Sequence, residues 1–197
     1  IENFRPGTLE RLGLEYEDIS KENPGLVLVR ISGYGQTGPY SPRPGYGVTA
    51  EAVGGVRHMI GEPDLPPARV ALAMTDHLGA LYGAYGAMLA LLNREKTGKG
   101  QVIDTALYEA AFSMMEPHIP AYDRLGIIPK RVGPKLPNTA PNSLYPTKDN
   151  NYILIASNND VTFKRLVEAM GKPELAEDPR YSTLIARKER ADEVDEI

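Results

Sequence analysis

Cysteine is absent from the 197 residues. Its absence excludes a disulfide scaffold, cysteine-ligated zinc, an iron–sulfur cluster and a thiol nucleophile, and it is consistent with a reducing, cytoplasmic location. The three histidines, His58, His77 and His118, are too scattered to indicate a metal site, so no bound metal is expected. The longest uncharged stretch, residues 78–92, is shorter than the roughly 20 apolar residues of a membrane span, so no membrane association is expected.

An excess of positive charge is also missing, because the formal net charge is −4 at pH 7. The chain therefore gives no sign of binding nucleic acid, although a local basic patch can still hold a small anionic ligand. The sequence contains no P-loop, serine nucleophile elbow or zinc motif. Its 42% hydrophobic and 24% charged residues are typical of a globular protein, and its 19 glycines and 17 prolines gather in clusters that predict many loops.

Hydrophobic runs and turn signals predict helices that alternate with strands. The apolar run at 26–32 is typical of a strand buried on both faces, and glycines three or four residues apart within 75–94 predict a helix that packs closely on a core. Residues 126–150 are rich in proline and predict a linker. The order indicates an α/β fold, with part of a parallel-stranded domain followed by the start of a smaller α/β domain. We expect further strands at 101–106 and 152–156, and further helices at 8–12, 16–22, 46–54, 107–122 (interrupted at Pro117), 161–170 and 184–196.

Residues 33–38 read Gly-Tyr-Gly-Gln-Thr-Gly directly after the first predicted strand, which matches the glycine fingerprint of dinucleotide-binding sites. That fingerprint needs a helix N-terminus to receive the pyrophosphate. Pro39, Pro42 and Pro44 follow at once and disfavour a helix there. We therefore reject an NAD site and expect a glycine loop at the carboxyl end of a strand, where loops often line ligand sites.

Asp76 lies in the first turn of the predicted helix at 75–94, and this position permits two interpretations. Acidic residues are favoured in a first turn because they complement the helix dipole, and Asp76 could do only that. Alternatively, the dipole keeps the carboxylate ionised and the small neighbours Gly79 and Ala80 leave room for a ligand. Asp76 would then be a nucleophile that attacks an acyl carbon.

Three segments together resemble the family III CoA-transferases, also called the CaiB/BaiF family, which includes formyl-CoA transferase and carnitine-CoA transferase. The first reads Ile-Glu-Asn-Phe-Arg-Pro-Gly-Thr-Leu-Glu-Arg-Leu-Gly at 1–13. The second reads Ile-Ser-Gly-Tyr-Gly-Gln-Thr-Gly-Pro at 31–39. The third combines Met-Thr-Asp at 74–76 with Leu-Asn-Arg-Glu-Lys-Thr-Gly-Lys-Gly-Gln at 92–101. Segments at 150–153 and 178–181 also look like the start of the family's small domain.

The resemblance implies a Rossmann-like large domain, a smaller domain and an interlocked homodimer. We expect residues 1–125 to be part of the CoA-binding large domain, residues 126–145 to be a linker, and residues 146–197 to begin the small domain. The resemblance also implies that half of the usual chain is missing. Residues 1–197 are therefore expected to be an internal fragment that is inactive by itself.

The activity that the resemblance implies is transfer of CoA from an acyl-CoA donor to a small carboxylic acid, through an aspartyl anhydride and an aspartyl-CoA thioester. CoA and acyl-CoA are then substrates, and no prosthetic group is expected. By position, Asp76 matches the family's catalytic aspartate, and Arg11 matches a phosphate-binding arginine. Formyl-CoA transferase has a lysine where this chain has Ser32. The other residues that match CoA contacts are Asn3, Phe4, Arg5, Ile31, Ser32, Gly33 and Tyr34.

Two alternatives to a transferase are a racemase-like isomerase of the same family and a catalytically inert fragment or subunit. The α-methylacyl-CoA racemases of the family have a catalytic histidine at the position aligned with Tyr46, and tyrosine is a poor base near neutral pH. This favours a transferase over a racemase-like isomerase, and the retention of Asp76 with its flanking loop argues against a catalytically inert fragment or subunit. The Met-Thr-Asp segment looks closer to members that use succinyl-CoA and a dicarboxylic acid. Arg57, Arg69 and His58 either meet the distal carboxylate of that acid or are solvated at the surface.

Overall fold

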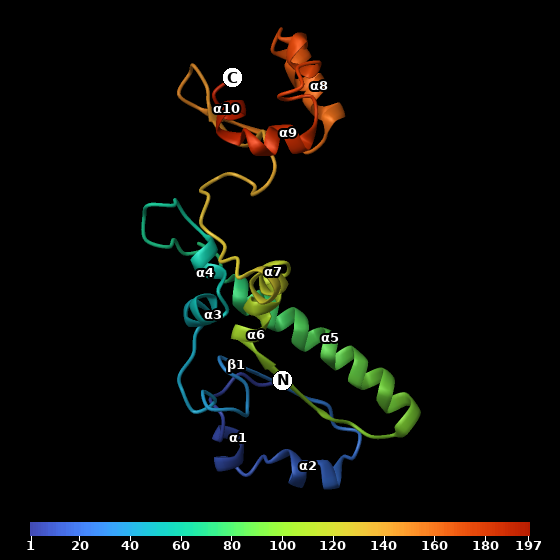
Figure 1. Cartoon of the computed structure of the whole chain (residues 1–197). Coiled ribbons are helices and arrows are strands. Elements are labelled where there is room, and N and C mark those ends of the chain that lie inside the picture. The colour runs from blue at the N-terminus through green and yellow to red at the C-terminus, as the bar shows by residue number, and fades with distance from the viewer. The chain divides into compact units, whose positions relative to one another are not determined.

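Residues 1–197 are all described by a computed structural model, which divides into two compact units. The first unit comprises Ile1–Ile60 and Pro66–Arg131, and the second comprises Gly61–Leu65 and Val132–Ile197. Figure 1 labels the α-helices of both units and strand β1. No helix combines the length and the apolar character that crossing a membrane requires. The division into a large domain, a linker at 126–145 and a small domain stays a prediction.

A pair of parallel strands forms the centre of the first unit. Strand β1 (Leu28–Ser32) pairs with β2 (Val102–Ala106), from Leu28 opposite Val102 to Ser32 opposite Ala106. Glu2 adds an isolated parallel bridge to Arg30 on β1. Almost every residue of β1 is buried, as its uninterrupted aliphatic run predicts. The α/β class and the parallel strands are therefore confirmed.

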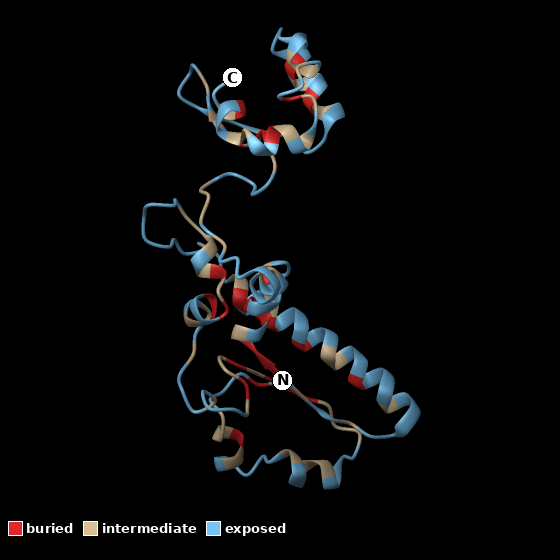
Figure 2. Ribbon diagram, in the orientation of Figure 1, coloured by how far each residue is buried: buried red, intermediate tan, exposed pale blue.

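The longest helix, α5 (Met74–Thr97), lies along this sheet (Figure 1). A Cβ added at Gly83 would lie 3.1 Å from a side-chain atom of β1, and one at Gly86 would lie 2.6 Å from a side-chain atom of β2. A Cβ at Gly79 would lie 2.5 Å from a side-chain atom of the helix after β2. The missing side chains therefore allow the helix to lie close to the strands, as the glycine spacing predicts. The opposite face of α5 is exposed in this chain, as Figure 2 shows. Its most exposed large apolar residues are Leu81, Tyr85, Met88 and Leu92.

Further helical segments complete the first unit. The predicted break at Pro117 is confirmed, because a 3-10 turn ends before it and a new helix begins after it. The sequence pattern does not predict α4, which packs Val56 against Ala111 and Met115. These segments are α1 (Thr8–Arg11), α2 (Tyr16–Glu22), α3 (Gly47–Val53), α4 (Val56–Met59), α6 (Leu107–Phe112), η1 (Ser113–Met115) and α7 (His118–Leu125).

The second unit consists of an antiparallel hairpin and short helices. Strand β3 (Asn142–Pro146) pairs with β4 (Tyr152–Ala156). The sequence pattern predicts β4 but does not predict β3, which lies in the proline-rich stretch. Asn159 caps the following helix by accepting a hydrogen bond from the Thr162 backbone N–H at 2.9 Å. The helical segments are α8 (Asp160–Ala169), η2 (Pro173–Ala176), α9 (Leu184–Glu189) and α10 (Ala191–Asp195).

The prediction of one helix over 184–196 is wrong. The backbone of Arg190, at φ −126° and ψ 34°, separates α9 from α10. The turn allows Arg187 on α9 to be fully buried while Val194 on α10 also reaches the core. That core contains Ala140, Phe163, Val167, Tyr181 and Val194.

Candidate active site

A cavity of about 360 Å³ opens in the first unit where β1 and β2 end. Ligands of open parallel sheets commonly bind at the carboxyl ends of the strands, because the loops there leave a crevice. The cavity is lined by the N-terminal turn, the end of β1, the loop after it, the start of α5 and the start of α6. Its lining residues are Asn3, Phe4, Arg5, Pro6, Ile31, Ser32, Gly33, Tyr34, Ser41, Arg43, Gly45, Tyr46, Asp76, Ala80 and Leu107.

The structure brings all the predicted site residues to this lining except Arg11. They come from segments that are far apart in the sequence, namely the turn at 3–5, the segment 31–34 and Asp76. Arg11 is exposed on α1, where its guanidinium donates to the Thr8 hydroxyl at 2.8 Å. Arg11 does not line this cavity, so its contact with a phosphate stays a prediction.

A buried ion pair holds the N-terminal turn of the cavity. The Phe4 backbone N–H donates to Glu2 Oε2 at 2.7 Å, and the other oxygen of Glu2 accepts from Arg30 Nε at 2.6 Å. Arg30 also donates to Glu10 at 2.7 Å, and this hydrogen bond lowers the pKa of the Glu10 carboxyl. The side chains of Arg30 and Glu2 are 10% and 5% exposed, so water competes little for these bonds. The turn at 3–5 is thereby tied to β1.

Gly33 and Gly45 bring the two ends of the loop at 33–45 into contact. A Cβ at Gly33 would lie 2.6 Å from the Gly45 Cα, and a Cβ at Gly45 would lie 2.8 Å from the Gly33 Cα. Only glycine permits this contact between two backbones. No helix begins directly after Gly38, in agreement with the rejection of an NAD site.

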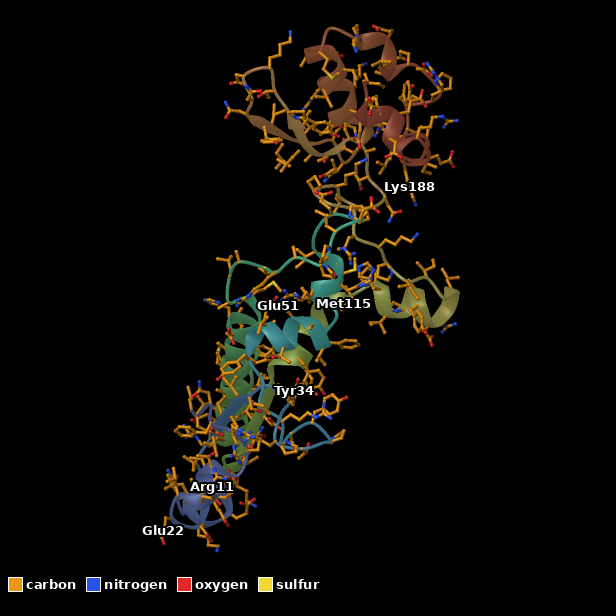
Figure 3. All side chains as sticks on the ribbon, turned by 90° about the vertical axis from the view of Figure 1, so that its left-hand side faces the viewer. Arg11, Glu22, Tyr34, Glu51, Met115 and Lys188 are labelled. Carbon is orange, nitrogen blue, oxygen red and sulfur yellow. The ribbon has the colours of Figure 1, made fainter.

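Tyr34, labelled in Figure 3, lies in the same loop and packs against two other aromatic rings. Its ring centroid lies 5.5 Å from that of Tyr40 and 5.8 Å from that of Tyr108. Burial raises the pKa of Tyr108, which keeps its phenol neutral. Tyr34 therefore forms a packed aromatic part of the cavity wall rather than a free side chain.

Asp76 presents a carboxylate that makes no hydrogen bond or ion pair and is exposed. It lies in the first turn of α5, at the positive end of the helix dipole. A Cβ at Gly47 would lie 2.8 Å from Asp76 Oδ2, so the glycine leaves the carboxylate unobstructed. Both interpretations of Asp76 fit its helix position, but an acid that only complements the dipole does not need to line a cavity.

Asp76 and Tyr46 also line a second cavity of about 310 Å³. Its wall includes Glu51 on α3, which Figure 3 labels and which is 1% exposed. The hydroxyl of Thr75 and one oxygen of Glu51 are buried there without a hydrogen-bond partner. The full lining is Tyr46, Gly47, Val48, Glu51, Arg69, Ala73, Thr75 and Asp76.

Sequence reasoning missed three polar side chains of the first lining, those of Ser41, Arg43 and Tyr46, as members of the site. Arg43 lies over the Tyr40 ring at 4.1 Å, and together with Arg5 it supplies the cationic charge of the cavity. Arg5 donates to the Pro42 carbonyl at 2.9 Å, which links the N-terminal turn to this loop. The only signal for Tyr46 was its alignment with the histidine of racemases.

Neither cavity is lined by His58, His77 or Arg57. His58 lies 3.0 Å from the Pro129 carbonyl, and His77 lies 2.7 Å from the Ala73 carbonyl. Arg57 lies 3.8 Å from the Glu51 carboxylate and lines neither cavity. No group of three or more His, Cys, Asp or Glu side chains could hold a metal ion.

Comparisons with known proteins bear on the whole chain. A family model described as CoA-transferase family III matches residues 1–197. The chain is 48% identical over 197 residues to the succinyl-CoA–D-citramalate CoA-transferase of Chloroflexus aurantiacus, covering 100% of this chain and 49% of that protein. It is 43% identical over 198 residues to the beta subunit of the succinyl-CoA–L-malate CoA-transferase of the same organism, again covering 100% and 49%.

A solved structure agrees with these sequence matches. The crystal structure of a CaiB/BaiF family protein from Brucella suis superimposes with a TM-score of 0.82 at 37% identity, covering 99% of this chain and 52% of that one. The chain thus spans about half the length of the curated relatives that it matches.

Proposed function

Because the chain belongs to CoA-transferase family III, we propose that the complete enzyme containing it moves CoA from an acyl-CoA to a small carboxylic acid. Asp76 is proposed to carry first the acyl group and then CoA. Two segments of the cavity wall are proposed to bind CoA. The turn Asn3, Phe4 and Arg5 contacts the CoA moiety, and Ile31, Ser32, Gly33 and Tyr34 lie beside its thioester.

One observation carries the proposal, namely the position of an unpaired carboxylate on the wall that two cavities share. Asp76 lines both the 360 Å³ and the 310 Å³ cavity. A nucleophile that exchanges partners must be reachable from the donor and from the acceptor, and it must not be neutralised by a fixed cation. Asp76 meets both requirements.

The donor half of the reaction begins when an Asp76 oxygen attacks the thioester carbon. The carbon–sulfur bond breaks, which leaves a mixed anhydride between Asp76 and the acyl group, together with CoA thiolate. The thiolate then attacks the Asp76 carbonyl carbon of the anhydride. This step forms an aspartyl-CoA thioester and releases the donor acid as its carboxylate.

The acceptor half repeats these steps in reverse. The carboxylate of the incoming acid attacks the aspartyl thioester, which expels CoA thiolate and forms a second anhydride. The thiolate then attacks the carbonyl carbon of the acceptor. The products are the new acyl-CoA and the free Asp76 carboxylate, so no proton is gained or lost over the cycle.

The surroundings of Asp76 support this chemistry. Arg5 and Arg43 give the first cavity the cationic charge that suits the phosphates of CoA. Backbone N–H groups in the turn at 33–35 are proposed to stabilise the oxyanion that forms at the attacked carbonyl. The packed ring of Tyr34 is proposed to help exclude water, because an anhydride hydrolyses readily.

Tyr46 argues against the racemase alternative. It lines the cavity beside Asp76 at the position where racemases of the family have a catalytic histidine. Removal of a proton from carbon needs a stronger base near neutral pH than a tyrosine hydroxyl. The unpaired Asp76 likewise argues against an inert subunit.

We propose succinyl-CoA as donor and a dicarboxylic acid as acceptor, because the names of both Chloroflexus relatives specify succinyl-CoA and a hydroxydicarboxylic acid. The enzyme is further proposed to be an interlocked homodimer. The exposed apolar face of α5 supports this assembly, because large exposed apolar patches commonly mark contacts with other protein surfaces.

The test replaces Asp76 by Ala and by Asn in the complete enzyme. We expect both variants to lose transfer from succinyl-CoA to the acids by at least ~1,000-fold, because the covalent intermediates can no longer form. Mass spectrometry would detect the new thioesters. In the wild type, hydroxylamine should trap the intermediate as a hydroxamate on the peptide that contains Asp76.

The matched control is Asp123→Asn, which removes an exposed carboxylate of α7. It should leave the rate unchanged. Retained transfer in the Asp76 variants would refute the assignment. Deuterium entering the α-carbon of an acyl-CoA in heavy water, without any acceptor acid, would instead support a racemase.

A further inference from the structure

The 310 Å³ cavity next to Asp76 differs from the first cavity in its size and charge. Its volume falls within the range of about 300–1,000 Å³ that small-molecule sites occupy. It is lined by two carboxylates, those of Glu51 and Asp76, and by one cation, Arg69. It therefore offers a small anionic ligand a single favourable position for a negative charge.

Arg69 is available for such a ligand. It is exposed, lies in the segment before α5, and makes no hydrogen bond or ion pair. The nearby Arg57, by contrast, lies 3.8 Å from the Glu51 carboxylate. The charge of Glu51 is thus balanced from outside the cavity, while the charge of Arg69 is not balanced by any group of the chain.

Buried polar atoms on the same wall also lack hydrogen bonds. The Thr75 hydroxyl is fully buried without a hydrogen bond, and Glu51 Oε2, which lies 3.8 Å from Arg57, likewise accepts none. Buried polar atoms are normally paired, so an unpaired group on a cavity wall is an indication of a missing ligand. A carboxylate can accept from Thr75, and a hydroxyl can donate to Glu51.

These observations concern the acceptor acid, and the inference rests on the proposed function. We propose that the second cavity binds the acceptor and that Arg69 pairs with a carboxylate other than the reacting one. The reacting carboxylate then lies at the uncharged aspartyl thioester of Asp76, and repulsion by the Glu51 carboxylate disfavours positions of the second charge away from Arg69. The enzyme thereby selects dicarboxylic acids over monocarboxylic acids of the same length.

The experiment is a competition between glutarate and pentanoate in the complete enzyme, with succinyl-CoA as donor. Both acids react with the same CoA-loaded enzyme, so any effect of Arg69 on the donor cancels in the ratio of glutaryl-CoA to pentanoyl-CoA. Arg69→Met should lower this ratio about 10- to 100-fold, because a charge-assisted hydrogen bond to the second carboxylate is lost. Arg69→Lys should keep most of the preference, because the positive charge remains.

Arg124→Met removes an exposed arginine of α7 that lines neither cavity, and it should leave the ratio unchanged. An unchanged ratio in Arg69→Met overturns the inference, as do equal losses in the Met and Lys variants. Neither result touches the proposed function, which fails only if the Asp76 variants still transfer CoA.

Discussion

Each unit of the chain holds one arginine that is largely withdrawn from water, and the two arginines differ in what they hold together. Arg30 in the first unit lies between the carboxylates of Glu2 and Glu10. Arg187 in the second unit donates to two backbone carbonyls and to Asp160, and its guanidinium lies 4.3 Å from the centre of the Phe163 ring.

Arg30 supports the wall of a cavity, whereas Arg187 supports only the packing of its unit. Arg30 ties β1 to the turn at 3–5, and that turn lines the cavity that contains Asp76. Arg187 joins loop backbones around the core of the second unit, whose largely apolar cavity has a volume of about 130 Å³. Similar polar networks therefore support the wall of the Asp76 cavity in one unit and only the fold in the other.

The largest expected effect comes from removing Arg187. Arg187→Met leaves two buried carbonyls without their donor, and at about 1–3 kcal/mol for each the second unit should lose about 2–6 kcal/mol of stability. Amide hydrogen exchange of residues 139–197 in the complete protein would measure the loss. The control Arg180→Met breaks an ion pair with Asp178 that is 57% exposed on the arginine side, and it should cost less than about 1 kcal/mol. Equal effects of the two variants would remove the distinction between buried and exposed arginines.

A smaller effect, but one on binding, is expected for Arg30. Arg30→Met frees the Glu2 carboxylate, which holds the Phe4 backbone N–H in the turn of the cavity. The KM for acyl-CoA should rise several-fold while kcat changes little, because the turn contacts CoA and not the reacting carbon in the proposed function. Steady-state kinetics of the complete enzyme would separate the two constants. A fall in kcat alone would contradict this role, and Lys21→Met, which removes an exposed ion pair with Asp18, serves as the control.

The smallest effect concerns the pH dependence of the Glu10–Arg30 pair. The hydrogen bond from Arg30 lowers the pKa of Glu10 below its ordinary value of 4.5. The pair therefore stabilises the folded state fully above pH 4.5, and this contribution disappears as the pH falls through the lowered pKa. Glu10→Gln should reduce stability at neutral pH by less than about 1 kcal/mol, because the Glu10 side chain is 36% exposed.

Urea unfolding at neutral and acidic pH would test this coupling. The difference between Glu10→Gln and the wild type should vanish at the acidic end. A difference that persists there would show that the carboxylate charge is not what stabilises the unit. Glu17→Gln, an exposed position on α2, should show no such pH dependence.

Much of the fold could be predicted because its signals are local. The run at 28–32, the glycine spacing of α5 and the cap at Asn159 all act within a few residues. Strand β3 escaped prediction because it exists through pairing with β4, and its own residues, bounded by Pro141 and Pro146, resemble a loop. The break at Arg190 likewise depends on the burial of Arg187, which no local pattern specifies.

The candidate site was predicted through the resemblance more than through the residues themselves. Asp76 alone permitted two interpretations, and the turn at 3–5 alone looks like an ordinary loop. Arg43 and Tyr46 join them on one lining only because Gly33 and Gly45 bring the loop back against itself. Such a contact between distant glycines is a property of the folded chain that composition and spacing do not reveal.

The glycine stripe of α5 has a consequence for how relatives of this chain can diverge. The distance between helix and sheet determines how far Asp76 stands from the strand ends, and a methyl group at Gly79 would already come within 2.5 Å of Leu107. The proposed nucleophile is therefore carried by a helix whose glycine face leaves little room for added side chains. The exposed segment that contains Arg69 has no comparable restriction, so in the proposed function a new acid preference can evolve or be engineered there without moving Asp76.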